Sequence, residues 1–296
     1  MRALALVERW PAPQAAAGVL RLEPADPAAP RRSVAPGPAA VVVDTVGDDR
    51  RRLPWASVSK LLVALALLVA CEEGTVDLDE PAGPPGSTVR HLLAHASGLG
   101  PDDPVPIAAP GRRRIYSNAG FDVLARHLAA RAGMAFVDYL GEGVLGPLAM
   151  ARTVLAPDAS PASGVVGPLT DLLALGRELL APVLVSTATL AEATAVAFPG
   201  LAGVLPGFGR YDPCDWGLGF EVKGAKAPHW TGRANGPSTF GHFGRSGTFL
   251  WVDPEAGVAC GALGDLAFGP WAADAWPVLA DAVIAQWGRG PGSTVA

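Results

Sequence analysis

The feature that most constrains the fold is a run of eleven apolar residues, Leu61 to Cys71. Together with its flanking residues, the run predicts one long helix from Ser57 to Glu72, which Gly74 ends. A helix that is apolar on every side must be buried on every side. Because so short a run cannot span a bilayer, we expect this helix at the centre of a globular core.

Strands are predicted at the two ends of the chain and helices in its middle. The expected strands are 19–22, 39–46, 219–222, 240–243, 249–253 and 258–263, with a proline-rich connection at 24–38. The expected helices are 88–94, 119–132, 136–144, 170–180 and 271–287. Because strands and helices do not alternate, this order predicts an α+β fold whose antiparallel sheet joins both ends of the chain. We expect one domain, 1–296, in which 1–56 and 207–296 form the sheet and the terminal helix, and 57–206 form a mostly helical subdomain.

Charge and cysteine usage argue against several functions. The net charge is −5, so the chain lacks the electrostatic footprint of a protein that binds nucleic acid or an anionic membrane. Its three cysteines include no Cys-x-x-Cys pair, which argues against a disulfide framework and a zinc cluster. The apolar stretch at 3–7 is too short for the core of a signal peptide. We therefore expect a cytoplasmic protein without a nucleic-acid or membrane partner, and no metal or cofactor is implied.

Ser57 and Lys60 form the sharpest local feature, at the start of the apolar helix. Residues three apart share a helix face, so we expect Ser57 Oγ and the Lys60 amine within hydrogen-bond reach. An amine at the head of an apolar run is partly desolvated, which lowers its pKa and suits it to act as a base. The helix N-terminus also offers N–H groups that can stabilise an oxyanion. The pair alone is a weak signal, because this spacing also arises by chance.

Two further motifs accompany this pair. Tyr116-Ser117-Asn118 stands at the head of a predicted helix, and His242-Phe243-Gly244 lies on a predicted strand. The order Ser-x-x-Lys, Tyr/Ser-x-Asn and Lys/His-x-Gly resembles the signature of the serine β-lactamase/DD-peptidase superfamily, the penicillin-binding-protein-like enzymes. Segments 92–99 (LLAHASGL), 147–150 (PLAM) and 216–220 (WGLGF) are similar to its class C β-lactamase-related branch, which includes the family VIII esterases. The likeness runs from about residue 16 to 287.

The resemblance implies a β-lactamase/DD-peptidase-like fold with the site between the sheet and the helical part. In it, Ser57 is the acylated nucleophile, Lys60 takes or shuttles its proton, and Tyr116 is a second acid/base. Which of Lys60 and Tyr116 is the first base stays open, because the two titrate as a coupled pair.

The remaining motif residues are expected to hold the substrate. By the resemblance, Asn118 contacts the acyl side, Gly244 leaves room for the substrate backbone, and the N–H groups of Ser57 and Arg245 form the oxyanion hole. His242 stands where true β-lactamases and DD-peptidases have lysine, so a permanent cation for a substrate carboxylate is lost. Arg245 is a candidate for supplying that cation instead.

Two other patterns in the sequence have simpler explanations. His91 and His95 have the spacing of a zinc-protease helix, but Leu92 replaces the catalytic glutamate, so a packed histidine is expected. Arg112 to Arg114 are expected on a solvated loop. We expect a serine hydrolase that acts as a carboxylesterase on small acyl esters. The alternatives are a D-amino-acid peptidase or amidase, a weak β-lactamase, and a non-catalytic acyl- or peptide-binding protein of the same fold.

Overall fold

The computed structural model describes residues 2–23 and 39–289, so the proline-rich connection predicted at 24–38 lies outside the described residues. A six-stranded antiparallel sheet has the order β2-β1-β10-β9-β8-β7. Its strands are β1 (Ala15–Leu22), β2 (Ala40–Val46), β7 (Glu221–Val222), β8 (Phe240–Gly244), β9 (Thr248–Asp253) and β10 (Val258–Gly264). The two ends of the chain meet where β1 pairs with β10, with Val19 opposite Cys260. The predicted α+β sheet built from both ends is confirmed.

The apolar helix lies in the middle of the molecule, as its composition predicted. It begins with a short 3₁₀ turn, η2 (Ala56–Val58), and continues as α1 (Ser59–Glu72), in which every residue from Ser59 to Ala70 is buried. The elements packed against it are α3 (Asn118–Ala132), α4 (Phe136–Leu140), the π-helical turn η3 (Gly141–Leu145) and the strand β8. Burial on all sides is the reason that the helix tolerates no polar residue beyond Lys60 until Glu72.

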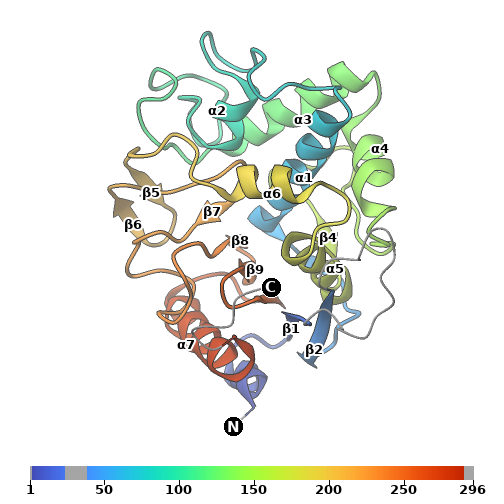
Figure 1. Cartoon of the computed structure of the whole chain (residues 1–296), viewed down its shortest axis with the longest axis vertical. Helices are drawn as coiled ribbons and strands as arrows, with labels where there is room; N and C mark the ends of the chain where they lie inside the picture. The colour runs from blue at the N-terminus through green and yellow to red at the C-terminus, as the bar shows by residue number, and fades with distance from the viewer. Residues whose placement is uncertain (1, 24–38, 290–296) are drawn as a thin grey trace.

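Helices cover both faces of the sheet. Alternate residues of β1 point to opposite sides: Ala16 and Leu20 join the core beneath α5 (Leu169–Leu180), whereas Ala17 and Val19 join a second core beneath α7 (Pro270–Trp287). The 3₁₀ helix η1 (Ala3–Arg9) packs beside α7 on that second face. In Figure 1, α2 (Val89–Leu93), α3 and α4 lie at one end of the molecule and α7 at the other, with the strands between.

Several short elements were not predicted. These are β3 (Leu53–Pro54), β4 (Val166–Gly167), β5 (Gly203–Leu205), β6 (Gly209–Tyr211) and the helix α6 (Thr187–Thr194). A two- or three-residue strand has no periodicity of its own and is defined only by the partner it pairs with. The predicted helix 136–144 is also interrupted, because α4 gives way to the π-helical turn η3.

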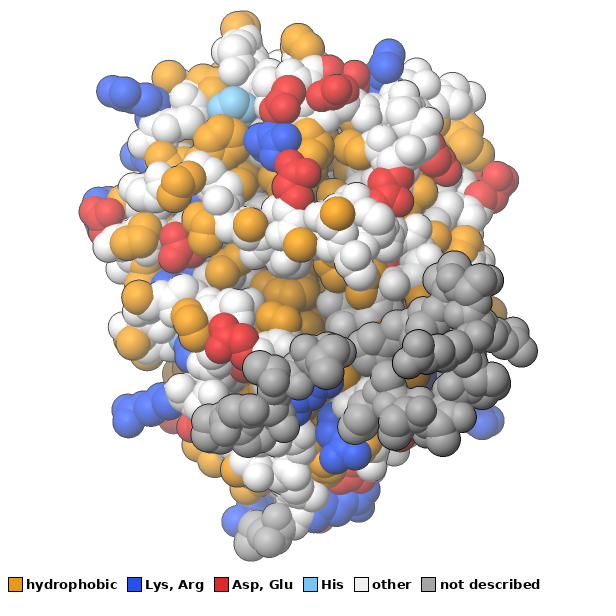
Figure 2. All heavy atoms as spheres, in the orientation of Figure 1, with side chains coloured by type: hydrophobic (Ala, Val, Ile, Leu, Met, Phe, Trp, Pro, Cys, Tyr) orange, Lys and Arg blue, Asp and Glu red, His pale blue; other side chains and the backbone are white. Residues whose placement is uncertain are grey.

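Surface properties fit the charge balance of the sequence. On the face drawn in Figure 2, basic and acidic side chains are interspersed among apolar ones. Within residues 2–23 and 39–289, no helix combines the length and apolar character needed to cross a bilayer. The division of the single domain at 56/57 and 206/207 stays a prediction.

Candidate active site

The candidate nucleophile, Ser57, is half-buried in η2, just before α1. Ala56 before it has a φ of 46°, in the left-handed region that residues with a Cβ rarely adopt. The turn is held from the preceding residue, since Trp55 N donates to Val165 O over 2.9 Å and Trp55 Nε1 donates to Gly167 O over 3.2 Å. Such local strain is kept only where the surrounding structure fixes it, and it is concentrated at functional sites.

A cavity of about 210 Å³ opens in front of Ser57. Among its lining residues are five that the sequence motifs singled out: Ser57, Tyr116, Asn118, His242 and Arg245. The structure therefore brings motifs from three distant parts of the chain to one place. Apolar side chains complete much of the wall, so the cavity suits a small acyl group.

Lys60 is fully buried on the first turn of α1, behind Ser57. Its Nζ donates to Asn118 Oδ1 over 2.7 Å and to Ala162 O over 2.9 Å, and it lies 4.8 Å from the centre of the Tyr116 ring. Those two oxygens, and not the expected Ser57 Oγ, are its hydrogen-bond acceptors in the described part of the chain. Burial lowers the pKa of Lys60 to about 7, against the opposing charges of two nearby aspartates. A large fraction of this amine is therefore neutral at pH 7.

The Tyr116 hydroxyl is buried and faces the cavity that Ser57 lines. Burial raises the pKa of Tyr116 well above its ordinary value, and the side chain of Ser57 offsets part of that rise. The phenol is therefore protonated at neutral pH and serves as a donor. The sequence left the first base open, and these opposite pKa shifts favour Lys60 over Tyr116.

His95 supports Tyr116 from behind, a role that the sequence did not reveal. The ring centres of His95 and Tyr116 are 4.6 Å apart, and the ring centre of Trp216 lies 4.8 Å from that of His95. His95 is buried, and its Nδ1 accepts a hydrogen bond from Ser117 N over 3.1 Å. Because it accepts at Nδ1, the neutral ring carries its proton on Nε2.

His95 is buried, as expected of a packed histidine, and His91 is half-buried. His91 Nδ1 lies 2.9 Å from Thr88 Oγ1, and no group of three potential metal ligands occurs among residues 2–23 and 39–289. The expectation of a solvated loop at 112–114 is wrong for one residue. Arg114 is buried and donates to the carbonyl oxygens of Cys214 and Ala197 over 3.0 and 2.8 Å, which anchors the segment that leads to Tyr116.

Tyr116-Ser117-Asn118 combines a helix cap with a cavity contact. Ser117 Oγ accepts from Gly120 N over 3.0 Å and so caps α3. Asn118, the first residue of α3, accepts from Lys60 and donates Nδ2 to Asp102 Oδ1 over 2.7 Å. An amide nitrogen carries two hydrogens, so Asn118 keeps one donor for a ligand in the cavity.

His242 lies on β8 and is neutral. Its Nδ1 donates to Phe243 O over 2.7 Å, which leaves Nε2 as a buried acceptor with no partner among the described residues. Burial and, after it, the charge of Lys60 lower the pKa of His242 to about 3. Near pH 6.5 His242 is therefore neutral and does not hold an anionic substrate as a cation.

Gly244 ends β8 directly against the candidate nucleophile. A Cβ at Gly244 would lie 2.5 Å from Trp55 O and 3.2 Å from Ser57 N. The close approach of the backbone that carries Ser57 therefore requires a glycine here, and the expected room for a substrate backbone stays a prediction. Arg245 follows in an exposed turn, and its N–H has no acceptor within the described chain.

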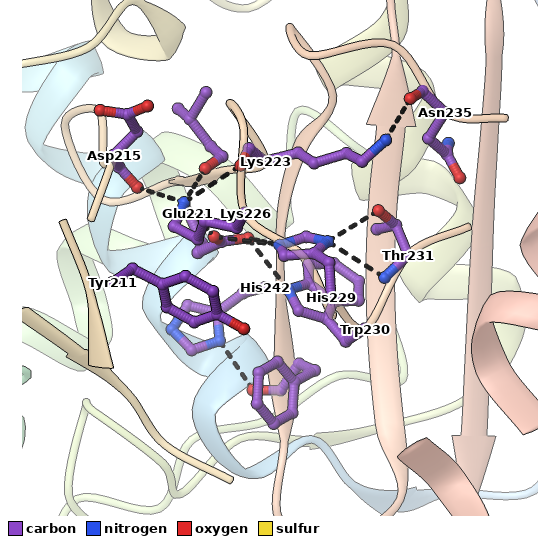
Figure 3. A network of polar contacts seen from close by, with 12 residues as sticks. Tyr211, Asp215, Glu221, Lys223, Lys226, His229, Trp230, Thr231, Asn235 and His242 are labelled. Carbon is purple, nitrogen blue, oxygen red and sulfur yellow. Dashed lines mark hydrogen bonds and ion pairs between the residues drawn. The ribbon is translucent and has the colours of Figure 1, made fainter. Parts of the chain in front are cut away.

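A buried ion-pair cluster, also absent from the sequence interpretation, borders the cavity (Figure 3). Glu221 on β7 pairs with Lys226 Nζ over 2.6 Å and accepts from His229 Nε2 and Trp230 Nε1, each over 2.9 Å. Burial alone would raise the pKa of Glu221, but His229 and Lys226 outweigh it and lower that pKa to about 2. The only sequence signal for this cluster is an acidic residue directly after the apolar segment 216–220.

Comparison with known proteins decides the family. The family model described as Beta-lactamase matches residues 39–283. The chain belongs to the β-lactamase family. The likeness covers nearly the whole fold, because a β-lactamase from Mycobacterium bovis is 48% identical and superposes with a TM-score of 0.89 over 97% of this chain and 100% of that one. The predicted superfamily and fold are thereby confirmed, whereas the class C and family VIII branch stays a prediction.

More distant relatives of this β-lactamase family member differ in what their names describe. A simvastatin synthase (LovD) from Aspergillus terreus is 17% identical, with a TM-score of 0.69 over 93% of this chain and 94% of that one, a likeness of fold. The D-alanyl-D-alanine-carboxypeptidase/endopeptidase AmpH of Escherichia coli is 29% identical in an alignment 139 residues long that covers 34% of this chain and 36% of the relative. The match thus spans about a third of that curated relative. The family comprises serine hydrolases, and the names of these similar proteins do not select one substrate.

Proposed function

We propose that this β-lactamase family member is a serine hydrolase that forms an acyl-enzyme on Ser57, with carboxylesterase activity on small, neutral acyl esters. The observation that carries the proposal is the buried Lys60 amine, whose pKa of about 7 keeps it partly neutral beside Tyr116 and the cavity. A protein that only binds acyl groups has no use for such an amine, because burying a lysine costs stability, and a pKa strongly shifted by burial beside a cavity is typical of a catalytic group.

In the proposed acylation, Lys60 and Tyr116 accept and return the protons. Neutral Lys60 takes the Ser57 proton, directly or through the Tyr116 hydroxyl, as Ser57 Oγ attacks the ester carbonyl. The N–H groups of Ser57 and Arg245 stabilise the oxyanion. When the C–O bond breaks, Tyr116 protonates the leaving alkoxide and recovers a proton from Lys60. Water then attacks the acyl-enzyme, gives its proton to the same pair, and releases the acid as Ser57 regains its hydrogen.

The preference for neutral substrates rests on His242. Its Nε2 presents a lone pair, not a cation, to the cavity, so it favours a substrate N–H or O–H and offers nothing to a carboxylate.

A D-amino-acid peptidase or amidase is the second candidate. The likeness to AmpH and the exposed Arg245 at the mouth of the cavity, which can attract a peptide carboxylate, support it. The substrate in that case binds with its charged end outside the cavity.

Turnover of matched substrates tests the proposal. We expect p-nitrophenyl acetate and butyrate to be hydrolysed with a higher kcat/KM than a D-Ala-D-Ala peptide or a penicillin, and kcat/KM to rise with pH through about 7 as Lys60 loses its proton. Ser57→Ala should lower ester turnover by about 10³-fold or more while Tm changes by no more than a few degrees. Faster turnover of the peptide would support the second candidate, and full ester turnover by Ser57→Ala would contradict both.

A further inference from the structure

The two acceptors of Lys60 are each backed by a carboxylate that no sequence motif singled out. The first acceptor is the Asn118 side chain. An ammonium group only donates and a carboxylate only accepts, so the Asn118 amide has one orientation that satisfies both neighbours. It turns Oδ1 to Lys60 at 2.7 Å and Nδ2 to Asp102 Oδ1 at 2.7 Å. Asp102 thereby determines that the oxygen of the Asn118 amide, and not its nitrogen, faces Lys60.

The second acceptor is the carbonyl oxygen of Ala162, and a turn holds it. Ser160 Oγ donates to Asp122 Oδ1 over 2.7 Å and accepts from Ala162 N over 3.2 Å. Ala162, the residue that presents its carbonyl oxygen to Lys60 at 2.9 Å, is thus tied through its own N–H and the Ser160 hydroxyl to Asp122.

Both tethers converge on one face of α3. Asn118 and Asp122 are four residues apart, which places them one above the other on that helix, and α3 packs against α1, which carries Lys60. Asp102 is exposed and Asp122 is half-buried. Neither is among the residues that line the cavity in front of Ser57. They can act on the reaction only through the groups they hold and through their charge.

We propose that Asp102 and Asp122 are positioning residues, which hold the Lys60 amine in its reacting orientation through Asn118 and the 160–162 turn and bias it toward its protonated form. The inference rests on Lys60 being the base of the proposed function.

The charges around Lys60 give the direction of the effect. Asp122 and Asp102 favour the ammonium form and raise the Lys60 pKa against the larger effect of burial. The other titratable groups facing it, Tyr116, His95 and His242, are neutral at pH 7. Removing either carboxylate charge therefore lowers the pKa of Lys60 further and makes more neutral amine available in acid.

The test measures the rate at which a neutral fluorophosphonate labels Ser57, followed by intact mass from pH 5 to pH 9. Asp102→Asn keeps an oxygen acceptor for Asn118 and removes the charge, whereas Asp102→Ala removes both. Asp103→Asn is the matched control, because it removes the charge of the adjacent exposed carboxylate. Asp122→Asn tests the second tether independently, and Tm confirms that each variant is folded.

We expect half-maximal labelling near pH 7 in the wild type and in Asp103→Asn. In Asp102→Asn the midpoint should fall by about one pH unit, so that labelling at pH 6 is about fivefold faster than in the wild type and labelling at pH 9 is equal. Asp122→Asn should shift the midpoint in the same direction. Asp102→Ala should show the same shift with an alkaline plateau about tenfold lower, because Asn118 is no longer oriented.

A merely structural role would lower the rate equally at every pH. The inference is overturned if the Asp102→Asn and Asp122→Asn profiles keep the midpoint of Asp103→Asn. In that case the proposed function stands, since the wild type is still labelled. A wild type that is not labelled at any pH overturns the inference and the proposed function together.

Discussion

The buried carboxylate of Glu221 offers the most quantitative test of how the cavity wall is held. Glu221 pairs with Gly241 across β7 and β8, one residue from His242, so its cluster stabilises the strand that carries the third motif. We consider Glu221→Gln, which keeps the shape of the side chain and removes its charge. The change leaves the ammonium of Lys226 buried with backbone carbonyls, those of Asp215 and Val222 among them, as its remaining partners.

Two estimates of the free energy of unfolding that Glu221→Gln loses agree. Removing one partner of a buried ion pair costs about 3–5 kcal/mol. The lowering of the Glu221 pKa from 4.5 to about 2 corresponds to about 3 kcal/mol of native-state stability. For a domain of this size we expect Tm to fall by about 10 °C. The direction of the pH dependence follows because the pKa of Glu221 is lower in the folded state than in the unfolded state. The stabilisation is present above about pH 4.5 and is lost as the pH falls toward 2, so the difference between wild type and variant narrows in that window.

Urea unfolding at pH 7 and at pH 3 measures both effects. Glu8→Gln is a suitable control, because it removes an exposed carboxylate. The double variant Glu221→Leu with Lys226→Met removes both charges and should recover much of the lost free energy of unfolding. A Glu221→Gln variant within about 1 kcal/mol of the wild type at pH 7 would refute the reasoning.

Three further predictions concern the strand beside Ser57. Gly244→Ala places a Cβ against Trp55 O and Ser57 N, so kcat/KM for an ester should fall by about 10²-fold. The control Gly141→Ala, where nothing lies within 4 Å of the added Cβ, should leave kcat/KM unchanged. Equal activity in the two variants would contradict the close approach at Gly244. Because the pKa of His242 is about 3, the ratio of kcat/KM for a neutral ester to that for an anionic one should not step near pH 6.5. His242→Lys should raise acylation by a penicillin, and an unchanged rate would contradict the argument that a missing cation disfavours β-lactams.

Local signals predicted the larger elements well. The apolar composition of α1 implied burial on all sides, and the turn between β9 and β10 followed from the Pro254–Gly257 sequence. Short pairings such as β3 with β4 could not be predicted, because each strand has two residues and its partner lies more than a hundred residues away. Tertiary context alone defines such elements.

The motifs named residues that the structure places around one cavity, but the motifs did not reveal what sets the chemistry of those residues. The pKa of Lys60 depends on its burial and on the charges of Asp122 and Asp102, and the tautomer of His242 depends on a backbone carbonyl. The role of His95 depends on a bond to Ser117, 22 residues along the chain. Such features depend on contacts between residues that are distant in the sequence, so the spacing within a motif cannot predict them.

The central claim is that Ser57 becomes acylated, and trapping the intermediate tests it most directly. The protein would be quenched in acid within milliseconds to seconds of mixing with p-nitrophenyl butyrate and analysed by intact mass and peptide mapping. Ser246→Ala, which alters a nearby serine that bonds Pro54 O, is the control. We expect one butyryl group on the peptide that contains Ser57, present in Ser246→Ala and absent in Ser57→Ala. Ester turnover with an acyl group on another residue, or one that persists in Ser57→Ala, would contradict it.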